Sequence, residues 1–203
     1  MWSRIERVDQ PTAEALLLAE VKEQLRIDAV VIDDDAFLNR CIRAAREMVE
    51  GPDGRGLAIM AADWRLTLDC FPKEVRIPMG PVLSIVSIVY VDGAGVAQTL
   101  DPADYQWRPG RYEARIQPAY GKAWPAPRSQ FDAVTIIFKA GFKGTEEDPI
   151  ELGNIPEPLR AAMRMLIAHW FKHRETTVVG VVPTEIQHGF EDIMNMFAVG
   201  RVA

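Results

Sequence analysis

Two histidines four positions apart are the residues best placed to do chemistry. His169 and His173 lie in a segment with helical periodicity, so both imidazoles could reach one metal ion from the same helix face. The residues between them are Trp, Phe and Lys, so no glutamate is present to act as a base, and His188 is the only other histidine. We therefore expect one histidine to pack beside the neighbouring aromatic residues, the other to be solvated, and no metal to be bound.

Other catalytic patterns are equally incomplete. None of the four serines lies in a Gly-x-Ser-x-Gly motif, so the sequence does not support a Ser-His-Asp triad. The run Gly141–Thr145 lacks the spacing of a phosphate-binding loop and is better interpreted as the exit from a strand. Asp33, Asp34 and Asp35 could bind a hard cation, but a cluster that caps a helix N-terminus explains them without metal. We expect no enzymatic activity and no cofactor.

Length, composition and charge indicate an ordinary globular protein. The chain has 203 residues, of which 48% are hydrophobic, enough for one domain with a sizeable core. Its 23 Lys and Arg residues and 29 Asp and Glu residues give a net charge of −6, which argues against sequence-specific DNA binding. The first ten residues contain no apolar signal segment, and the longest apolar stretch, residues 82–91, is too short to span a membrane.

The two cysteines indicate a reducing compartment. Cys41 lies in a helical pattern and Cys70 at the end of a strand pattern, and both are expected to be reduced, partly buried thiols. A single disulfide between them is the alternative.

The period of the apolar residues divides the chain into three parts. Residues 12–57 and 156–199 have helical periodicity, whereas residues 62–140 alternate with period two and contain many prolines and tryptophans. We expect an α+β fold, in which N- and C-terminal helices form a small helical bundle core and the middle forms a β-rich antiparallel insertion. The second helix, after the three aspartates, should bury one stripe of residues and leave Arg46 on another face; the stripe comprises Phe37, Cys41, Ala44, Ala45 and Met48.

Two segments have the composition of contact surfaces. The last helix, predicted over residues 184–197, is rich in methionine and aromatic residues and lies near the C-terminus; its candidate contacts are Phe190, Ile193, Met194, Met196 and Phe197. The alternative is that this helix closes the core. The loop around Tyr120 and Trp124 could anchor a subunit or tail contact, or could be a stabilised turn.

The order of motifs along the chain resembles the head–tail connector (adaptor) family of long-tailed bacteriophages and gene transfer agents. The resemblance covers residues 16–197, and one departure is Leu17, where a Ser or Thr N-cap is expected. The motifs are residues 18–28, 44–47, 54–57, 64–72, 77–82, 89–93, 100–105, 115–125, 140–142, 155–159 and 169–175.

This resemblance implies a structural virion protein at the head–tail junction, present in the host cytoplasm during assembly. Such connectors dock beneath the portal as a ring, usually of twelve copies, extend the DNA channel and provide a platform for stopper and tail proteins. The C-terminal region would dock on the portal, and Phe190→Asp with Phe197→Asp would then block docking while leaving the fold intact. The alternative is another phage tail or baseplate component that uses the β-rich middle as a binding module.

Overall fold

The computed structural model describes residues 3–11, 13–51, 56–110, 113–142, 155–174 and 187–197. These ranges contain four α-helices, one short 3-10 helix and two antiparallel sheets, so the mixed α+β class is confirmed. The elements are β1 (Ser3–Arg7), α1 (Leu18–Leu25), α2 (Asp35–Val49), β2 (Ala62–Leu68), β3 (Val75–Ile77), β4 (Val82–Val91), β5 (Ala97–Thr99), η1 (Pro102–Asp104), β6 (Tyr105–Pro109), β7 (Ala114–Pro118), β8 (Val134–Ala140), α3 (Glu157–Lys172) and α4 (Gln187–Met196).

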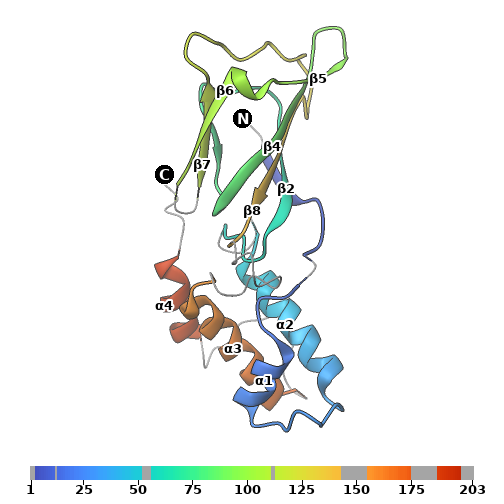
Figure 1. Cartoon of the computed structure of the whole chain (residues 1–203), viewed down its shortest axis with the longest axis vertical. Helices are drawn as coiled ribbons and strands as arrows, with labels where there is room; N and C mark the ends of the chain where they lie inside the picture. Colours follow the sequence, from blue (N-terminus) through green and yellow to red (C-terminus); the bar gives the residue numbers. More distant parts are fainter. Residues whose placement is uncertain are drawn as a thin grey trace.

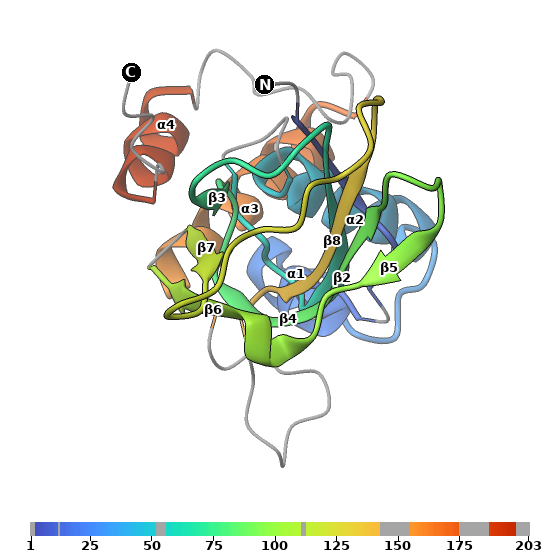
Figure 2. The same ribbon diagram turned by 90° about the horizontal axis from the view of Figure 1, so that it is seen from above.

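Helices and strands are separated along the long axis of the molecule. Figure 1 shows the four helices at one end and the sheets at the other, with the β1 strand and the ends of β2 and β8 leading from one to the other. Seen from above, the strands lie over α1, α2 and part of α3, while α4 lies to one side (Figure 2). No helix in the part of the chain described by the structure is long and apolar enough to cross a membrane.

The strands form one sheet of five strands, in the order β1-β2-β8-β4-β5, and one of three, in the order β3-β7-β6. Trp64, Leu66 and Leu68 of β2 point to the same side and are buried, as the period-two pattern predicts. Side chains from both sheets join one hydrophobic cluster, which includes Ile77 of β3 and Ile116 of β7. The two sheets therefore pack against each other through apolar side chains.

The helices bury their apolar faces in a second hydrophobic cluster, which includes Leu38, Leu166 and Trp170. The predicted stripe on α2 is only partly correct. Cys41 and Ala45 are buried, but the other three predicted residues are half-buried at the edge, and the buried face is completed instead by Leu38, Ile42, Arg46 and Val49. Because α2 contacts both α1 and α3, its buried face is wider than one stripe.

Three further local expectations need correction. The strand β1 was not expected, because Ile5 is the only apolar residue among its five. Cys70 is exposed rather than partly buried, because β2 ends two residues earlier; both cysteines are free. Asp34 occupies the N-cap of α2 but its side chain makes no capping hydrogen bond. At α1 the Leu17 N-cap is compensated, since the Glu20 side chain accepts a hydrogen bond from the Leu17 backbone N–H at 3.0 Å.

Candidate functional site: contact surfaces and a buried ion network

Most of the contact residues predicted on the last helix are used inside the chain. Phe190, Met194 and Phe197 are at most 5% exposed and belong to the helical cluster, and Ile193 is half-buried against it. Met196 points away and is 66% exposed. The contacts of α4 with α3 explain this burial. Of the five residues, only Met196 is largely available to a partner, and the double substitution of Phe190 and Phe197 would disturb the core.

Tyr120 and Trp124, predicted together as a contact, have different environments in the loop between β7 and β8. Trp124 is half-buried and stacks on Phe71, with ring centroids 4.7 Å apart and planes 7° from parallel. Tyr120 is fully exposed, and Phe131, later in the same loop, is 85% exposed. The loop lies at the end of the molecule farthest from the helices (Figure 1). Trp124 therefore fixes the loop, whereas Tyr120 and Phe131 are free to contact another molecule.

The candidate metal and phosphate sites involve His169, His173 and Gly141, which lie in the described part of the chain. The rings of His169 and His173 lie 4.6 Å apart, but no group of three or more metal-binding side chains occurs among the residues that the structure describes. Gly141 directly follows β8, and its φ of +142° places the backbone so close to Ala61 that a Cβ would lie 2.4 Å from the Ala61 nitrogen. This glycine serves a close approach of two backbone segments. Residues 143–145 lie outside the described ranges.

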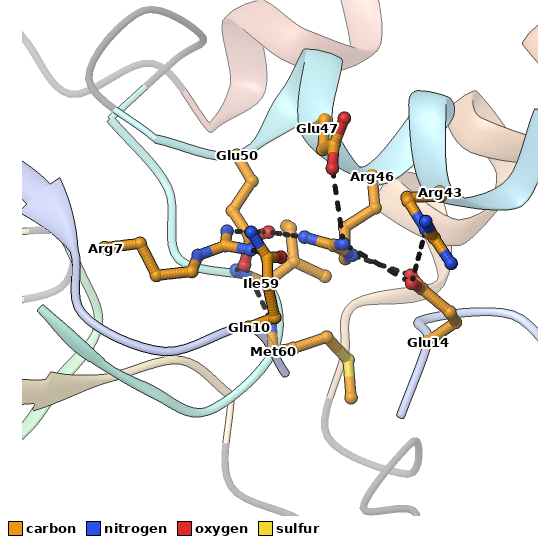
Figure 3. Close-up of polar contacts among 9 residues, drawn as sticks. All are labelled: Arg7, Gln10, Glu14, Arg43, Arg46, Glu47, Glu50, Ile59 and Met60. Atoms are coloured by element: carbon orange, nitrogen blue, oxygen red, sulfur yellow. Dashed lines mark hydrogen bonds and ion pairs between the residues drawn. The ribbon is translucent and has the colours of Figure 1, made fainter. Parts of the chain in front are cut away.

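A buried ion network lies where the helices meet the sheets (Figure 3). The Arg46 and Glu50 side chains, one turn apart near the end of α2, are each 1% exposed and form an ion pair of 2.5 Å. The Arg46 guanidinium also donates to both carboxylate oxygens of Glu14, at 2.6 and 3.3 Å. This geometry is bidentate, which is the strong form of an arginine–carboxylate contact.

Glu50 connects three parts of the chain. Its Oε2 atom accepts hydrogen bonds from Arg46 and from Arg7 of β1, while its Oε1 atom accepts from the backbone N–H groups of Ile59 and Met60, at 3.0 and 3.1 Å. The Arg7 guanidinium also lies over the Trp64 ring of β2, 4.6 Å from its centroid. One carboxylate therefore ties the end of α2 to the first strand and to the segment that enters β2.

The ion pairs of Arg46 explain why its charged guanidinium group can be buried. Burial alone would lower the pKa of Arg46, but the hydrogen bonds with Glu14 and the charge and hydrogen bond of Glu50 outweigh it and raise the pKa. The sequence pattern predicted Arg46 on a face away from the core and gave no sign of the network. The one available signal is the i, i+4 spacing of Arg46 and Glu50, which is also common on solvated helices.

An exposed apolar segment at the helical end was missed by the sequence interpretation. Between α1 and α2, Val30 is 80%, Val31 40% and Ile32 71% exposed. This segment lies at the tip of the helical end, opposite the loop that carries Tyr120 (Figure 1). A signal was present, because three consecutive branched apolar residues directly precede the three aspartates without helical periodicity. The molecule thus has exposed apolar side chains at both ends of its long axis.

Comparison with known proteins gives matches in structure only. No protein-family model and no curated protein sequence matches the chain. A chain of the neck of an empty gene transfer agent particle, computed with C6 symmetry, is 26% identical with a TM-score of 0.76, and the match covers 98% of this chain and 97% of the other. A chain in the virion of a native gene transfer agent particle is 24% identical over the same shares, with a TM-score of 0.76.

A third similar chain comes from the neck of a native gene transfer agent particle computed with C12 symmetry. It is 21% identical with a TM-score of 0.69, and the match covers 98% of this chain and 97% of the other. The two matches below 25% identity show that the fold is shared. Together, the three matches confirm the resemblance that the order of motifs indicated. The chain is similar over nearly its whole length to chains of gene transfer agent necks and virions.

Proposed function

We propose that this chain is a structural protein of the virion neck of a gene transfer agent or related phage, and that it acts there as the head–tail connector (adaptor). In this role it docks as a ring beneath the portal, extends the DNA channel and gives stopper and tail proteins a platform. The observation that carries the proposal is the match to a gene transfer agent neck chain at 26% identity and a TM-score of 0.76, over 98% of this chain. A shared local motif would not extend over the whole length.

The construction of the molecule supports a structural rather than a catalytic role. Glu50 holds α2, β1 and the entry to β2 in one fixed arrangement, so a load on the helices is transmitted directly to the sheets. Exposed apolar side chains occur at both ends of the long axis, where neighbours in a stacked neck would be met. In a connector of this family, the helices would form the small helical bundle of the core. Residues 62–140 would form the β-rich insertion at its periphery, within a single connector domain.

A ring of this chain requires head-to-tail contacts between two different surfaces, closed by rotation. The matched necks were computed with C6 and C12 symmetry. We propose a ring of twelve copies, in agreement with the family. The net charge of −6 suits a channel through which DNA slides, since a basic lining would hold phosphates in place.

Portal docking is proposed for the C-terminal end of the chain, around α4. Among the five predicted contact residues, Met196 is the one whose side chain is mostly open, and its flexible thioether adapts to an irregular partner surface. Phe190, Met194 and Phe197 then contribute by holding α4 against α3. Their role is therefore indirect. Removing these side chains would displace α4 from α3, whereas removing a direct contact would only take away atoms that touch the portal.

Negative-stain electron microscopy of the chain mixed with the portal protein from the same genome tests the proposal. We expect added ring density beneath the portal with the wild-type chain. Met196→Ser should weaken the ring density without a change in melting temperature, and Val96→Ser, a comparably exposed residue between β4 and β5, is the matched control. A portal that stays bare at high concentrations of wild-type protein would overturn the connector role.

A further inference from the structure

The segment between α1 and α2 is exposed but held rigidly. Arg26 ends α1 in the left-handed conformation, with φ of 59° and ψ of 37°. Asp28 then accepts hydrogen bonds from the backbone N–H groups of Val30, at 3.1 Å through its side chain, and of Val31, at 3.0 Å through its carbonyl. The Asp35 N–H donates to the Ile32 carbonyl at 3.1 Å, which closes the segment onto α2. The backbone from Asp28 to Asp35 is therefore fixed by its own hydrogen bonds.

One buried lysine clamps this segment from beneath. Lys22 of α1 is 5% exposed, and its ammonium group contacts three acceptors: the Ala29 carbonyl at 3.3 Å, the Val31 carbonyl at 2.7 Å and the Asp35 carboxylate at 2.5 Å. The ammonium group thus donates two hydrogen bonds to backbone carbonyls and forms one ion pair. A second tie is the ion pair of Arg174 with Asp34, at 2.6 Å. The clamp holds the backbone against the helices while the Val30 and Ile32 side chains point to solvent.

We propose that this segment, residues 28–33, is a preorganised docking tip for a different protein of the neck, one that offers an apolar pocket with a basic rim. The inference rests on the proposed function. Rigid exposed apolar side chains lose little conformational entropy on binding, which is how an interface anchor gains affinity. A segment built only to connect two helices would not need three exposed branched apolar residues on a backbone held by several hydrogen bonds.

Charge indicates the chemistry of the partner. Residues 17–36 carry six acidic and two basic side chains, a formal charge of −4. Glu20, Asp34 and Asp35 are ion-paired with Arg160, Arg174 and Lys22. Glu23, Asp28 and Asp33 are exposed, as is one basic residue, Arg26. An interface with Lys or Arg around its pocket would be complementary to these three exposed carboxylates and would associate faster at low salt. An acidic surface would be repelled.

A second copy of this chain is a poor occupant of the tip. The two arginines of α3 are already paired within the chain, Arg160 with Glu20 and Arg164 with Glu157. Outside the helical end, residues 61–140 have a net positive formal charge, with nine basic and eight acidic side chains, and they lie at the opposite end of the long axis. A tip bound to that end of another copy would join molecules end to end. Such a contact propagates into an open filament and does not close a ring. The tip is therefore assigned to a different neck protein.

The test measures binding of the intact chain to each neck and tail protein of the same genome, separately purified and immobilised, and to itself. Among the proteins that bind, we expect one other than this chain to bind through the tip, and to bind more weakly as NaCl rises from about 0.1 M to about 0.5 M. Val30→Ser with Ile32→Ser should weaken that binding by about tenfold or more. The matched control is Val86→Ser with Val96→Ser, which removes two other half-exposed valines and should leave it unchanged.

Two further variants separate the parts of the proposal. Asp33→Asn with Glu23→Gln should weaken binding only at low salt, since both carboxylates are exposed and neither holds the segment. Lys22→Met should weaken binding although Val30 and Ile32 are still present, because the clamp is lost.

The outcomes distinguish this inference from the proposed function. If the wild-type chain forms a ring on the portal and the Val30/Ile32 variant binds every neck protein as the wild type does, the tip proposal is overturned and the connector role stands. Loss of self-association alone would identify a second copy as the occupant and also overturn it. If the wild-type chain binds no neck protein at all, both proposals fail.

Discussion

The helical end and the sheet end of this molecule are stabilised in different ways. In the helical end, ion pairs join different elements: Arg46 with Glu14, Arg160 of α3 with Glu20 of α1, and Lys22 of α1 with Asp35 of α2. In the sheet end the ion pairs are more exposed: Arg76 with Glu74 and Arg115 with Glu113 join residues two apart in sequence. The pair of Arg65 with Glu6 joins β2 to β1, but both of its side chains are half-exposed. Strand positions there are fixed by backbone ladders instead.

This difference predicts where single substitutions should be harmful. A helix has satisfied its backbone internally, so only side chains determine how it sits against its neighbours. A strand in the five-stranded sheet is positioned by hydrogen bonds that no side-chain change removes. We therefore expect the helical end to be sensitive to single side chains and the sheet end to be tolerant.

The largest effect is expected from Phe190→Asp with Phe197→Asp. Both rings are buried in the helical cluster, and losing each costs about 3–5 kcal/mol, before the penalty for a buried charge is added. Thermal unfolding followed by circular dichroism and limited proteolysis at α4 would measure this. A variant that melts like the wild type and yet forms no ring on the portal would show that this face of α4 contacts the portal directly, as the sequence alone predicted.

The next effect tests the ion network directly. Glu50→Ala removes the acceptor for Arg46, Arg7 and two backbone N–H groups, so about 3–5 kcal/mol of unfolding free energy should be lost in urea denaturation. The control in the sheet end is Arg65→Ala, which breaks the half-exposed pair with Glu6 and should cost less than about 1 kcal/mol. Equal losses for the two variants would abolish the contrast between the ends.

A smaller loss is expected when an aromatic side chain of the sheet end is removed. Trp124→Ala deletes the stack on Phe71 from a loop whose flanking strands stay paired, so about 1–2 kcal/mol should be lost. The portal ring should form as before in electron microscopy. Loss of assembly with an unchanged melting temperature would instead favour a binding module centred on this loop.

No loss of stability is expected in the last test, which compares one cysteine from each end. Burial raises the pKa of the Cys41 thiol to about 11, whereas Cys70 is exposed. The folded state therefore favours the neutral Cys41 thiol, a contribution that is complete below the pKa of the unfolded thiol and is lost as the pH rises towards 11. In Cys70→Ser protein at pH 8, a thiol reagent should label nothing until urea is added. Rapid labelling of native protein would show that α2 opens.

The sequence predicted the sheet end better than the helical end, for the same physical reason. Alternation of large apolar residues from Trp64 to Leu68 is a local signal, and the period-two segments from residue 62 to residue 140 all became strands. The buried state of Arg46 depends on Glu14, which is 32 positions away, and periodicity carries no information on such a pair. The same limit applies to α4, whose apolar face is compatible with either a core or a partner.

The strand β1 has a consequence for synthesis of the chain. It leaves the ribosome before its partner β2, which begins about 55 residues later, after α1 and α2. At about 5–20 residues per second, the strand waits about 3–12 s for its partner. Three of its five residues are charged, namely Arg4, Glu6 and Arg7. Charge on an unpaired strand discourages pairing with other nascent chains, so the same residues that later bind Glu50 and Arg65 protect the chain while it is being made.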